Sequence, residues 1–575
     1  MFNKIIDWSV NNRLLILIAL FATIVGAIMV IPKLNLDAFP DVTNVQVAVN
    51  TEAPGLAAEE VEQLITYPIE AVMYALPDVE QVRSISKTGL SGVTVVFKEG
   101  TDIYFARQLV FERLQAAKEL IPEGVGTPEM GPNTSGLGQV FQYLLISDKD
   151  AGYDAMALRS LNDWVVKLLV MPVDGVTDVL SFGGIVRQYQ VNVDPSKLLS
   201  YNLTQEDVVG ALDNNNANVG GWYMNRGQEQ LVIRGAGWFE SGDAGISNIK
   251  QVPVKTVDGT VVTVSDIAKV EMGSEIRQGA VTMSSRDEQG NIQSSGEVVT
   301  GIILKRMGEN TKTTIDGINA REQMINQALP EGVKFVVLYD QAELITKAVT
   351  TVTDALLFAF VLIIIILALF LMNLSATFLV LISIPIAIGL ALMVMTWLGI
   401  SANLMSLGGL AVAIGMLVDG AVVMVENIFK QLALAQDRAK QKLSAEEIQS
   451  TISLAAQAVV RPIFFATAII LVVFMPLFSF EGVEAKLFQP MAISIILAVI
   501  SAILVALFVV PALATFMFKN GVKERESFVL KPLDKLYRKG LKAAMKHTKV
   551  VIVASILLLV GAASLVPQIG TEFVP

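Results

Sequence analysis

Seven long apolar runs dominate the hydrophobic pattern of the chain. Each is long enough to cross a hydrocarbon core, which needs about 20 helical residues. The first run is too long for a secretory signal and no small-residue cleavage site follows it, so we expect an uncleaved anchor. The pattern therefore predicts seven transmembrane helices, at roughly residues 14–32, 355–372, 377–398, 404–429, 461–480, 488–517 and 550–567.

The polar region between the first two runs alternates short β-branched segments with amphipathic helical ones. This alternation is typical of split βαβ units of the ferredoxin-like type. We therefore expect a large α+β domain outside the membrane, with a first unit near its start. Its predicted elements are a strand at Val45–Thr51, a helix at Ala57–Ala75 that breaks near Pro68, a strand at Val93–Lys98 and a helix at Tyr104–Leu120.

An internal repeat indicates a second unit. The last helix of the first unit stops at Ile121-Pro-Glu-Gly-Val125, and a similar Leu329-Pro-Glu-Gly-Val333 follows a helix predicted near Thr311–Ala328. The sequence between the units is rich in Gly and Asn around Asn214–Arg226 and has a hairpin signal at Val257–Thr260. We expect an inserted β-rich docking subdomain there.

A longer repeat relates the first apolar run to the last. Val30–Pro40 resembles Leu565–Pro575, and Pro32, Asp37 and Pro40 match Pro567, Glu572 and Pro575 in register. Repeated halves are common in transporters. We therefore expect the chain to be the first half of a transporter whose second half adds another external domain and five further spans.

The distribution of charge predicts the orientation of the spans. The net charge is -11, but residues 519–549 carry ten Lys and Arg against three acidic residues. Positive charge in short flanking loops marks the cytoplasmic side. The N-terminus is thus expected inside and residues 33–345 outside. Cysteine is absent, which excludes disulfides and cysteine metal sites.

Together these patterns predict a polytopic α-helical membrane protein with a large α+β external domain. Within the basic block, Phe528–Met545 has apolar residues at helical spacing with Lys and Arg between them. It is typical of an interfacial helix on the inner leaflet, although a soluble helix docked on the protein would have the same pattern. The expected segments are 1–32 (first span), 33–345 (porter and docking region), 346–518 (spans two to six), 519–549 (basic helix), 550–567 (span seven) and 568–575 (start of a second external domain).

The fourth span contains two acidic residues, Asp419 and Glu426. A charged Asp near the bilayer centre costs roughly 2.5–3.5 kcal/mol, so such residues usually mark proton or ion paths. Seven residues of helix place Glu426 within about 20° of Asp419 and about 10 Å further along the axis. We expect a proton relay. The alternatives are an Asp419 neutralised permanently by a buried partner and a Glu426 that is simply solvated near the membrane edge.

Three methionines, Met405, Met416 and Met424, lie in the same span. Thioether sulfur is a soft ligand suited to Cu(I)-like ions, so these residues are candidates for a metal path. Methionine also fills gaps between packed helices, and we favour that interpretation.

The sequence contains no signature of an enzyme. A phosphate-binding Gly-rich loop, a dinucleotide-binding motif and a nucleophile elbow are all absent, and His547 is the sole histidine. The energy for transport must then come from an ion gradient or from a partner protein, and we expect a secondary transporter with no cofactor and no nucleic-acid partner.

Several motifs, in order along the chain, resemble the resistance-nodulation-division superfamily and, within it, the heavy-metal efflux branch. The first is Val418-Asp419-Gly-Ala-Val-Val-Met-Val-Glu426-Asn427. The others are Asp37-Ala-Phe-Pro-Asp41-Val-Thr-Asn44-Val-Gln-Val47, Ala53-Pro-Gly55, Thr66-Tyr-Pro-Ile-Glu70, Gly100-Thr-Asp-Ile-Tyr-Phe-Ala-Arg107-Gln-Leu-Val110, Gly131-Pro132, Ser135-Gly-Leu-Gly138 and Asn403-Leu-Met-Ser-Leu-Gly408.

This resemblance implies a homotrimeric pump in the inner membrane of a Gram-negative bacterium, with a periplasmic adaptor protein and an outer-membrane channel as partners. It implies exchange of protons for metal cations, with Asp419 as the essential proton carrier and Glu426 as its helper. It also implies that a lysine from the second half pairs with Asp419. A multidrug exporter and a truncated fragment that does not transport remain the alternatives.

The transported ion stays open between Cu or Ag and Zn, Co, Cd or Ni. Ala413 and Gln139 stand where divalent-metal members commonly carry an acidic residue, whereas Leu417 and Ile276 stand where a methionine path would continue.

Overall fold

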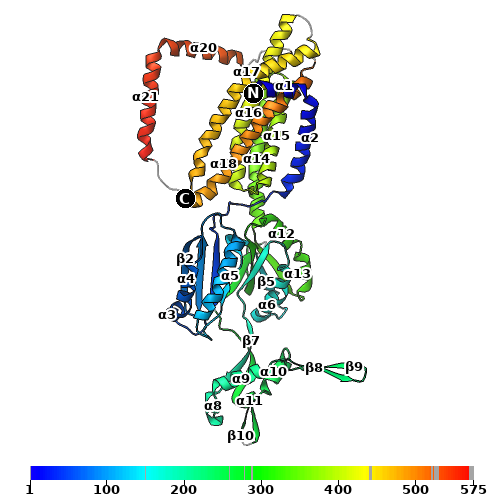
Figure 1. The fold of residues 1–575 in the computed structure, drawn as a ribbon, viewed down its shortest axis with the longest axis vertical. Coiled ribbons are helices and arrows are strands. Elements are labelled where there is room, and N and C mark those ends of the chain that lie inside the picture. Colours follow the sequence, from blue (N-terminus) through cyan, green and yellow to red (C-terminus); the bar gives the residue numbers. More distant parts are fainter. Residues whose placement is uncertain are drawn as a thin grey trace. The chain divides into compact units, whose positions relative to one another are not determined.

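The computed structural model describes residues 2–148, 150–257, 259–277, 279–286, 289–439, 443–519, 522 and 530–568. It divides into two compact units, one formed by Met1–Val42 with Glu343–Pro575 and the other by Thr43–Ala342 (Figure 1). Most of the repeat predicted at Leu565–Pro575 and the start of the helix predicted at Phe528–Met545 lie outside the described residues.

The first unit is helical, and seven of its described helical segments are long and apolar enough to cross a membrane, as predicted. The short amphipathic helix α1 precedes the first of them. The helices are α1 (Phe2–Asn11), α2 (Arg13–Val30), α14 (Gln341–Leu371), α15 (Leu374–Trp397), α16 (Leu404–Ala439), α17 (Ala445–Phe474), α18 (Gly482–Leu504), α19 (Val510–Met517), α20 (Leu530–Lys546) and α21 (Thr548–Leu565), with a π-helical turn η5 (Val505–Val509) between α18 and α19.

Helix α16 lies at the centre of this unit because α15, α17 and α18 all pack against it. The closest approach is at Gly409, where an added Cβ would lie 2.4 Å from Ser494 Oγ and 2.7 Å from the Met491 carbonyl oxygen of α18. Small residues allow such close helix packing. The segment before Thr43 also belongs to this unit, since Leu36 forms a β-bridge with Ala402.

The second unit begins with a ferredoxin-like βαββαβ fold, as predicted. Its antiparallel sheet has the order β2-β3-β1-β4, and its two helical segments bury their apolar faces against this sheet. The elements are β1 (Gln46–Glu52), α3 (Ala58–Val61), η2 (Glu62–Thr66), α4 (Tyr67–Met73), β2 (Val79–Lys87), β3 (Leu90–Phe97), α5 (Ile103–Leu120) and β4 (Pro128–Met130).

The second ferredoxin-like fold repeats the first, with the sheet order β6-β14-β5-β15. The helix predicted near Thr311–Ala328 is in fact two helices, α12 and α13, interrupted at Ala320–Arg321. The elements are β5 (Thr134–Ser147), α6 (Ala155–Leu161), η3 (Asn162–Val166), α7 (Lys167–Val170), β6 (Val176–Phe182), β14 (Ile292–Arg306), α12 (Thr311–Asn319), α13 (Glu322–Ala328) and β15 (Val333–Asp340).

The predicted break near Pro68 is wrong. The helix continues from Ala58 to Met73 and accommodates one π-helical turn, η2, just before Pro68. The second repeat has the same turn, η3, at the matching place, although Leu168 stands there in place of proline. Proline is therefore not the cause. In both repeats the turn positions a buried polar side chain, Thr66 or Asn162, for hydrogen bonds to neighbouring strands.

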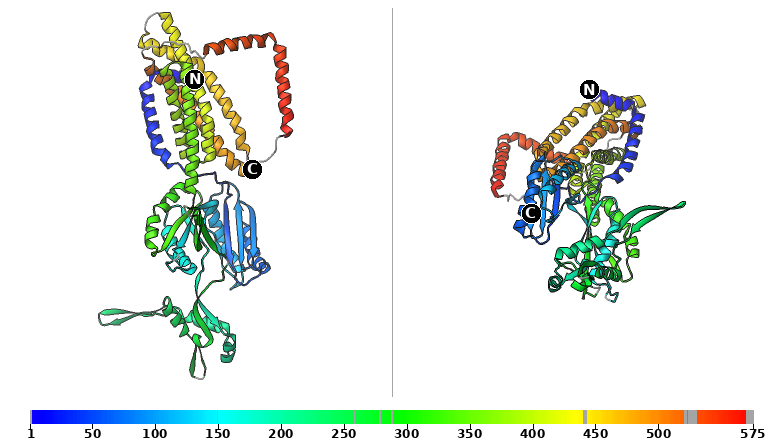
Figure 2. Two further views of the ribbon diagram at one scale, coloured as in Figure 1. Left: turned by 180° about the vertical axis from the view of Figure 1, so that it is seen from behind. Right: turned by 60° about the horizontal axis from the view of Figure 1, so that its bottom comes forward.

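The predicted insertion lies between β6 and β14. Its described residues form three two-stranded antiparallel ladders and four short helices around a small core. The ribbon β8–β9 is exposed along its whole length and projects from the rest of the insert in both views of Figure 2. The elements are β7 (Arg187–Val193), α8 (Pro195–Tyr201), α9 (Gln205–Asn215), β8 (Val219–Arg226), β9 (Glu229–Gly235), α10 (Asp243–Lys250), β10 (Pro253–Val257), β11 (Thr260–Thr263), α11 (Val264–Ile267) and β12 (Ala268–Ser274).

The insert interrupts a single strand of the second repeat. Phe182, at the end of β6, pairs with Thr300 of β14, and Val281, at the start of β13 (Val281–Arg286), pairs with Val298. The two strands thus run along β14 with one position between them, which Gly183 fills. An added Cβ at Gly183 would lie 3.0 Å from Val281 Cβ, so the chain leaves and re-enters the strand at adjacent points.

Candidate proton-transfer helix

The N-terminus of α16 is fixed by a buried cap. The Asn403 side-chain oxygen accepts hydrogen bonds from the backbone N–H groups of Met405 and Ser406, and the Ser406 hydroxyl accepts one from the Asn403 N–H. Such reciprocal bonds satisfy the donors that a helix start leaves unpaired. The rotation of α16 about its axis is therefore set at its first turn.

One face of α16 is not covered by any described residue. Its exposed side chains recur three or four positions apart, which places them on one stripe of the helix. We call this the acidic stripe, and it consists of Val412, Gly415, Asp419, Val423, Glu426 and Lys430. An added Cβ at Gly415 would meet no atom within 4 Å, so there is open space beside the stripe.

The opposite face of α16 is packed into the helical core. Residues such as Leu417, Met424 and Ile428 are buried against the neighbouring helices. The structure thus brings Asp419 and Glu426 to one face, as their spacing predicts, and within the described residues neither has a hydrogen-bond or ion-pair partner. Their roles in proton transfer stay predictions.

Asn427 ties the carboxylate-bearing segment to the next helix. Its Nδ2 donates a hydrogen bond of 2.6 Å to the carbonyl oxygen of Ala455 in α17. The sequence motif assigns a role to Glu426 but none to Asn427. Nothing in the local sequence distinguishes the hydrogen-bonded Asn427 amide from a solvated one.

The three methionines differ in burial and in their position around α16, and their part in a metal path stays a prediction. Met424 is fully buried in the helical core, whereas Met405 and Met416 are partly buried. At 100° per residue, Met405 and Met416 lie within about 20° of each other, but Met424 lies about 80° away from Met416. No group of three or more His, Cys, Asp and Glu suited to a metal occurs among the described residues.

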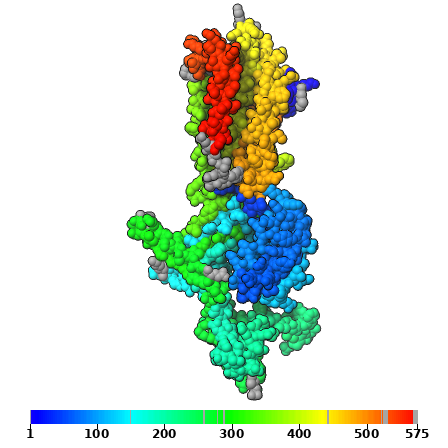
Figure 3. Space-filling view, turned by 90° about the vertical axis from the view of Figure 1, so that its left-hand side faces the viewer, coloured from blue at the N-terminus to red at the C-terminus, as the bar shows by residue number. Residues whose placement is uncertain are grey.

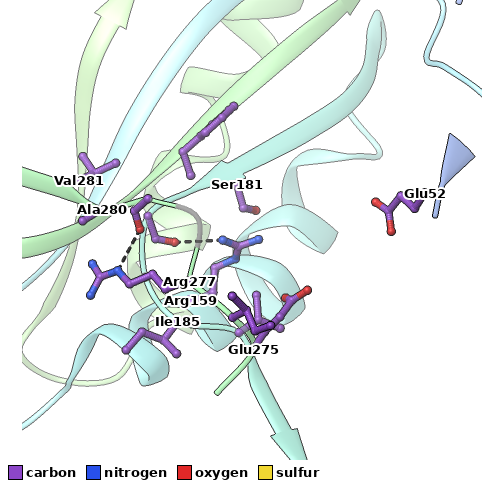
Figure 4. A pocket seen from close by; sticks show the side chains of 14 residues that line it. Glu52, Arg159, Ser181, Ile185, Glu275, Arg277, Ala280 and Val281 are labelled. Carbon is purple, nitrogen blue, oxygen red and sulfur yellow. Dashed lines mark hydrogen bonds between the residues drawn. The ribbon is translucent and has the colours of Figure 1, made fainter. Parts of the chain in front are cut away.

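A cavity of about 540 Å³ lies where the insert joins the second repeat, and Figure 4 shows its lining. Arg159 donates from Nε to Asp163 at 2.8 Å and from a terminal nitrogen to the Gly183 carbonyl oxygen at 3.0 Å. Arg277, in the connection between β12 and β13, binds Glu297. The two arginines thus hold the two chain segments that connect the second repeat to the insert. Neither arginine was identified from the sequence. Gly183 and Glu297 are distant in sequence from the arginines that they contact, and Arg159 with Asp163 has the spacing of an ordinary surface ion pair.

A buried polar network continues from this cavity into the core of the second repeat. Ser181 donates to Asp163, Asn162 donates to Ser181, and the Tyr143 hydroxyl donates to Asn162 Oδ1 at 2.8 Å. Burial raises the pKa of Tyr143 well above its ordinary value, so the hydroxyl remains a neutral donor.

A central apolar helix with two carboxylates on one face and a pair of ferredoxin-like folds are features of a polytopic membrane protein with a large α+β domain. Comparison with known proteins agrees. Residues 5–575 match the AcrB/AcrD/AcrF family, and the chain belongs to it. The predicted membership of the resistance-nodulation-division superfamily and its heavy-metal branch is confirmed by this match together with the relatives of the chain.

Two of the relatives are named for metal resistance or for cation efflux. The chain is 40% identical over 581 residues to the cobalt-zinc-cadmium resistance protein CzcA of Cupriavidus metallidurans, covering 100% of this chain and 53% of that protein. It is 33% identical over 579 residues to the cation efflux system protein CusA of Escherichia coli K12, covering 100% of this chain and 54% of CusA. A crystal structure of a heavy metal efflux pump superposes with a TM-score of 0.80 at 31% identity, covering 98% of this chain and 52% of that one. The chain spans about half the length of the relatives it matches.

Proposed function

We propose that this chain supplies the proton-carrying helix of a proton-driven exporter of heavy-metal cations, within an assembly of about twice its length. The observation that carries the proposal is the acidic stripe, since two carboxyl groups on an apolar, otherwise packed helix are expensive unless they serve a path. The names of the relatives support metal cations as the substrate.

The proposed mechanism depends on what covers the acidic stripe during the cycle. A carboxyl group that faces a cation in one state and an apolar surface in the next will release and then take up a proton. The open space beside Gly415 would admit a helix that brings such a cation close to Asp419. Glu426, nearer the end predicted to be cytoplasmic, would pass the proton on.

Motion of α16 would reach other helices through specific contacts. The Asn427 amide ties α16 to α17, and α17 in turn holds α1, because Ser453 and Gln457 both donate to the carboxylate of Asp7. We expect a rotation or shift of α16 on protonation to move α17 and α1 with it. Small shifts at one site are amplified when packed elements have two discrete arrangements.

The resemblance also supports a homotrimer in the inner membrane, with residues 33–345 in the periplasm. The insert would then contact a periplasmic adaptor protein and an outer-membrane channel. Its exposed ribbon β8–β9 suits contacts with other chains, since Trp222 and Val232 are 80% and 68% exposed.

The decisive test is Asp419→Asn in the assembled pump, with proton flux and metal efflux measured together in membrane vesicles. We expect both fluxes to fall to background while the pump still assembles. Asp437→Asn is the matched control because it removes the same charge from an exposed position further along α16. Coupled efflux that survives Asp419→Asn would refute the relay.

A panel of ions in the same vesicles tests the substrate. Cu(I) and Ag(I) are to be compared with Zn, Co, Cd and Ni, and an organic dye is included for the multidrug alternative. Efflux of the dye without any metal would overturn the proposed substrate class but leave the relay intact.

A further inference from the structure

Helix α20 has two chemically distinct faces. At 100° per residue, its apolar residues cover one side of the helix and its basic residues cover the opposite side. The apolar set is Leu533, Leu536, Tyr537, Leu541 and Met545, and the basic set is Lys531, Lys535, Arg538, Lys539, Lys542 and Lys546. This arrangement is typical of a helix that lies in a membrane interface.

No described residue covers the apolar face of α20. Its members are between 44% and 71% exposed, far more than the buried faces of α15 and α16. The following helix α21 has no buried residue, and its surface (red) is open to the viewer in Figure 3. Five large apolar side chains in water would be costly, so this face requires an apolar surface.

The basic face carries strong charge. Six Lys and Arg oppose a single acid, Asp534, which gives α20 a net charge of +5. Asp534 is paired with Arg538 at 2.6 Å, and this hydrogen bond raises the pKa of Arg538 above its ordinary value. The only acidic side chain of the helix is thus already engaged, and the lysines determine what the polar face attracts.

The connection to α21 fixes where α20 lies. Helix α20 ends at Lys546 and α21 begins at Thr548, with only His547 between them. Since α21 is apolar enough to span a membrane, the last turn of α20 must be at the membrane surface. At that surface, lipid tails can cover the apolar face, and anionic headgroups can pair with the basic face.

We propose that α20 is a binding surface for anionic lipid headgroups, which hold it on the bilayer through Lys535, Lys539 and Lys542. Anionic lipids attract such residues with about 1 kcal/mol each, which corresponds to about fivefold in partitioning per lysine. Lysine side chains are long enough to bend from the basic face toward the headgroups while the apolar face remains in the acyl boundary. The proposal depends on membrane insertion of α21 but not on transport.

The test uses the full chain, which has no cysteine, so that a single introduced thiol labels one site. Leu541→Cys is labelled with a polarity-sensitive fluorophore, and the protein is reconstituted in vesicles of phosphatidylcholine alone or with phosphatidylglycerol. A quencher attached to the acyl chains reports the depth of the label. We expect strong quenching in the anionic vesicles, weak quenching in the zwitterionic ones, and a decrease with added salt.

Two triple variants separate charge from apolar burial. K535Q/K539Q/K542Q is expected to weaken partitioning by about 100-fold and to remove the difference between the two lipids. K535R/K539R/K542R keeps the charge and is expected to retain it. Equal quenching in both lipids would show a general interfacial helix, and no quenching in either would show a soluble one, so each result would overturn the proposal.

Discussion

The polar network around Tyr143 links side chains in the core of the second repeat. Tyr143 is fully buried, and its hydroxyl is the innermost donor of a chain that ends at Arg159. An unsatisfied buried polar group costs more than the net gain from one hydrogen bond. The stability of the second repeat should therefore fall when a single polar atom of this network is removed.

Tyr143→Phe removes one oxygen and leaves Asn162 Oδ1 without this donor. We expect the free energy of unfolding of the second repeat to fall by about 1–3 kcal/mol, measured by denaturant titration of the solubilised chain. Tyr201→Phe, at a tyrosine that is 38% exposed, is the control and should have little effect. Equal losses in the two variants would mean that the buried hydrogen bond is not the cause.

Two helix caps in the insert depend on pH. Hydrogen bonds from the Thr204 backbone N–H and hydroxyl lower the pKa of Asp207 below its ordinary value of 3.8, and Thr263 does the same for Asp266. A lowered native pKa gives stability that is present above the unfolded pKa and lost as the pH falls through the native one. These caps should thus hold at neutral pH and weaken below about pH 4.

Amide hydrogen exchange can measure this effect at the first turn of α9. Protection there should fall on acidification relative to α12, whose cap Asn310 does not titrate. Asp207→Asn should abolish the pH dependence of the α9 signal. A parallel loss in α12 would indicate general acid unfolding instead.

Sequence can single out a residue as a candidate where its environment makes that residue type unusual. Asp419 in an apolar span can be recognised without a structure because a carboxylate there is costly. The partners of Tyr143 could not be recognised, because Asn162 and Ser181 are ordinary residues whose contact depends on strand pairing.

Helix α16 combines a packed face with an open one, and two glycines distinguish them. Gly409 faces α18 closely, whereas Gly415 lies on the acidic stripe beside open space. Gly415→Leu should leave the thermal stability of this chain unchanged but abolish efflux by the assembled pump, because it fills the space that a covering helix needs. Gly409→Leu should destabilise the chain itself by about 1–3 kcal/mol or more through overpacking.

A thermal melt of the chain and an efflux assay of the pump, run on both variants, check this prediction. Normal efflux with Gly415→Leu would mean that nothing approaches the acidic stripe at that point.

Elements were predicted well where apolar periodicity is long and poorly where it is local. For each of the seven spans and for the helix α5, at least one predicted end lies within a few residues of the observed end. The π-helical turns η2 and η3 leave no periodic trace in sequence, and proline at position 68 gave a misleading signal. The local pattern also does not predict the short strand β4 or the interrupted strand β6–β13, because their partner strands come from other parts of the chain.

At the scale of the whole molecule, the position of the insert makes it removable. Deleting Gly184–Ala280 joins Gly183 directly to Val281, in the register that β14 already imposes. We expect the shortened chain to insert in membranes and to keep a protease-resistant second repeat, but to lose assembly with its outer partners. Deleting residues 51–147, a segment of equal length that contains α5 and β5, is the control and should destroy the fold.

Limited proteolysis and co-purification would measure both outcomes. Loss of the resistant fragment on deleting Gly184–Ala280 would show that the insert is needed to fold the repeat.

The acidic stripe also has a consequence for how such a protein is made. A helix that presents Asp419 and Glu426 to lipid is disfavoured in the bilayer until another helix covers them. We therefore expect membrane insertion and assembly to be coupled during biogenesis, and we expect quality-control proteases to distinguish an unassembled chain from an assembled one by the same two carboxyl groups.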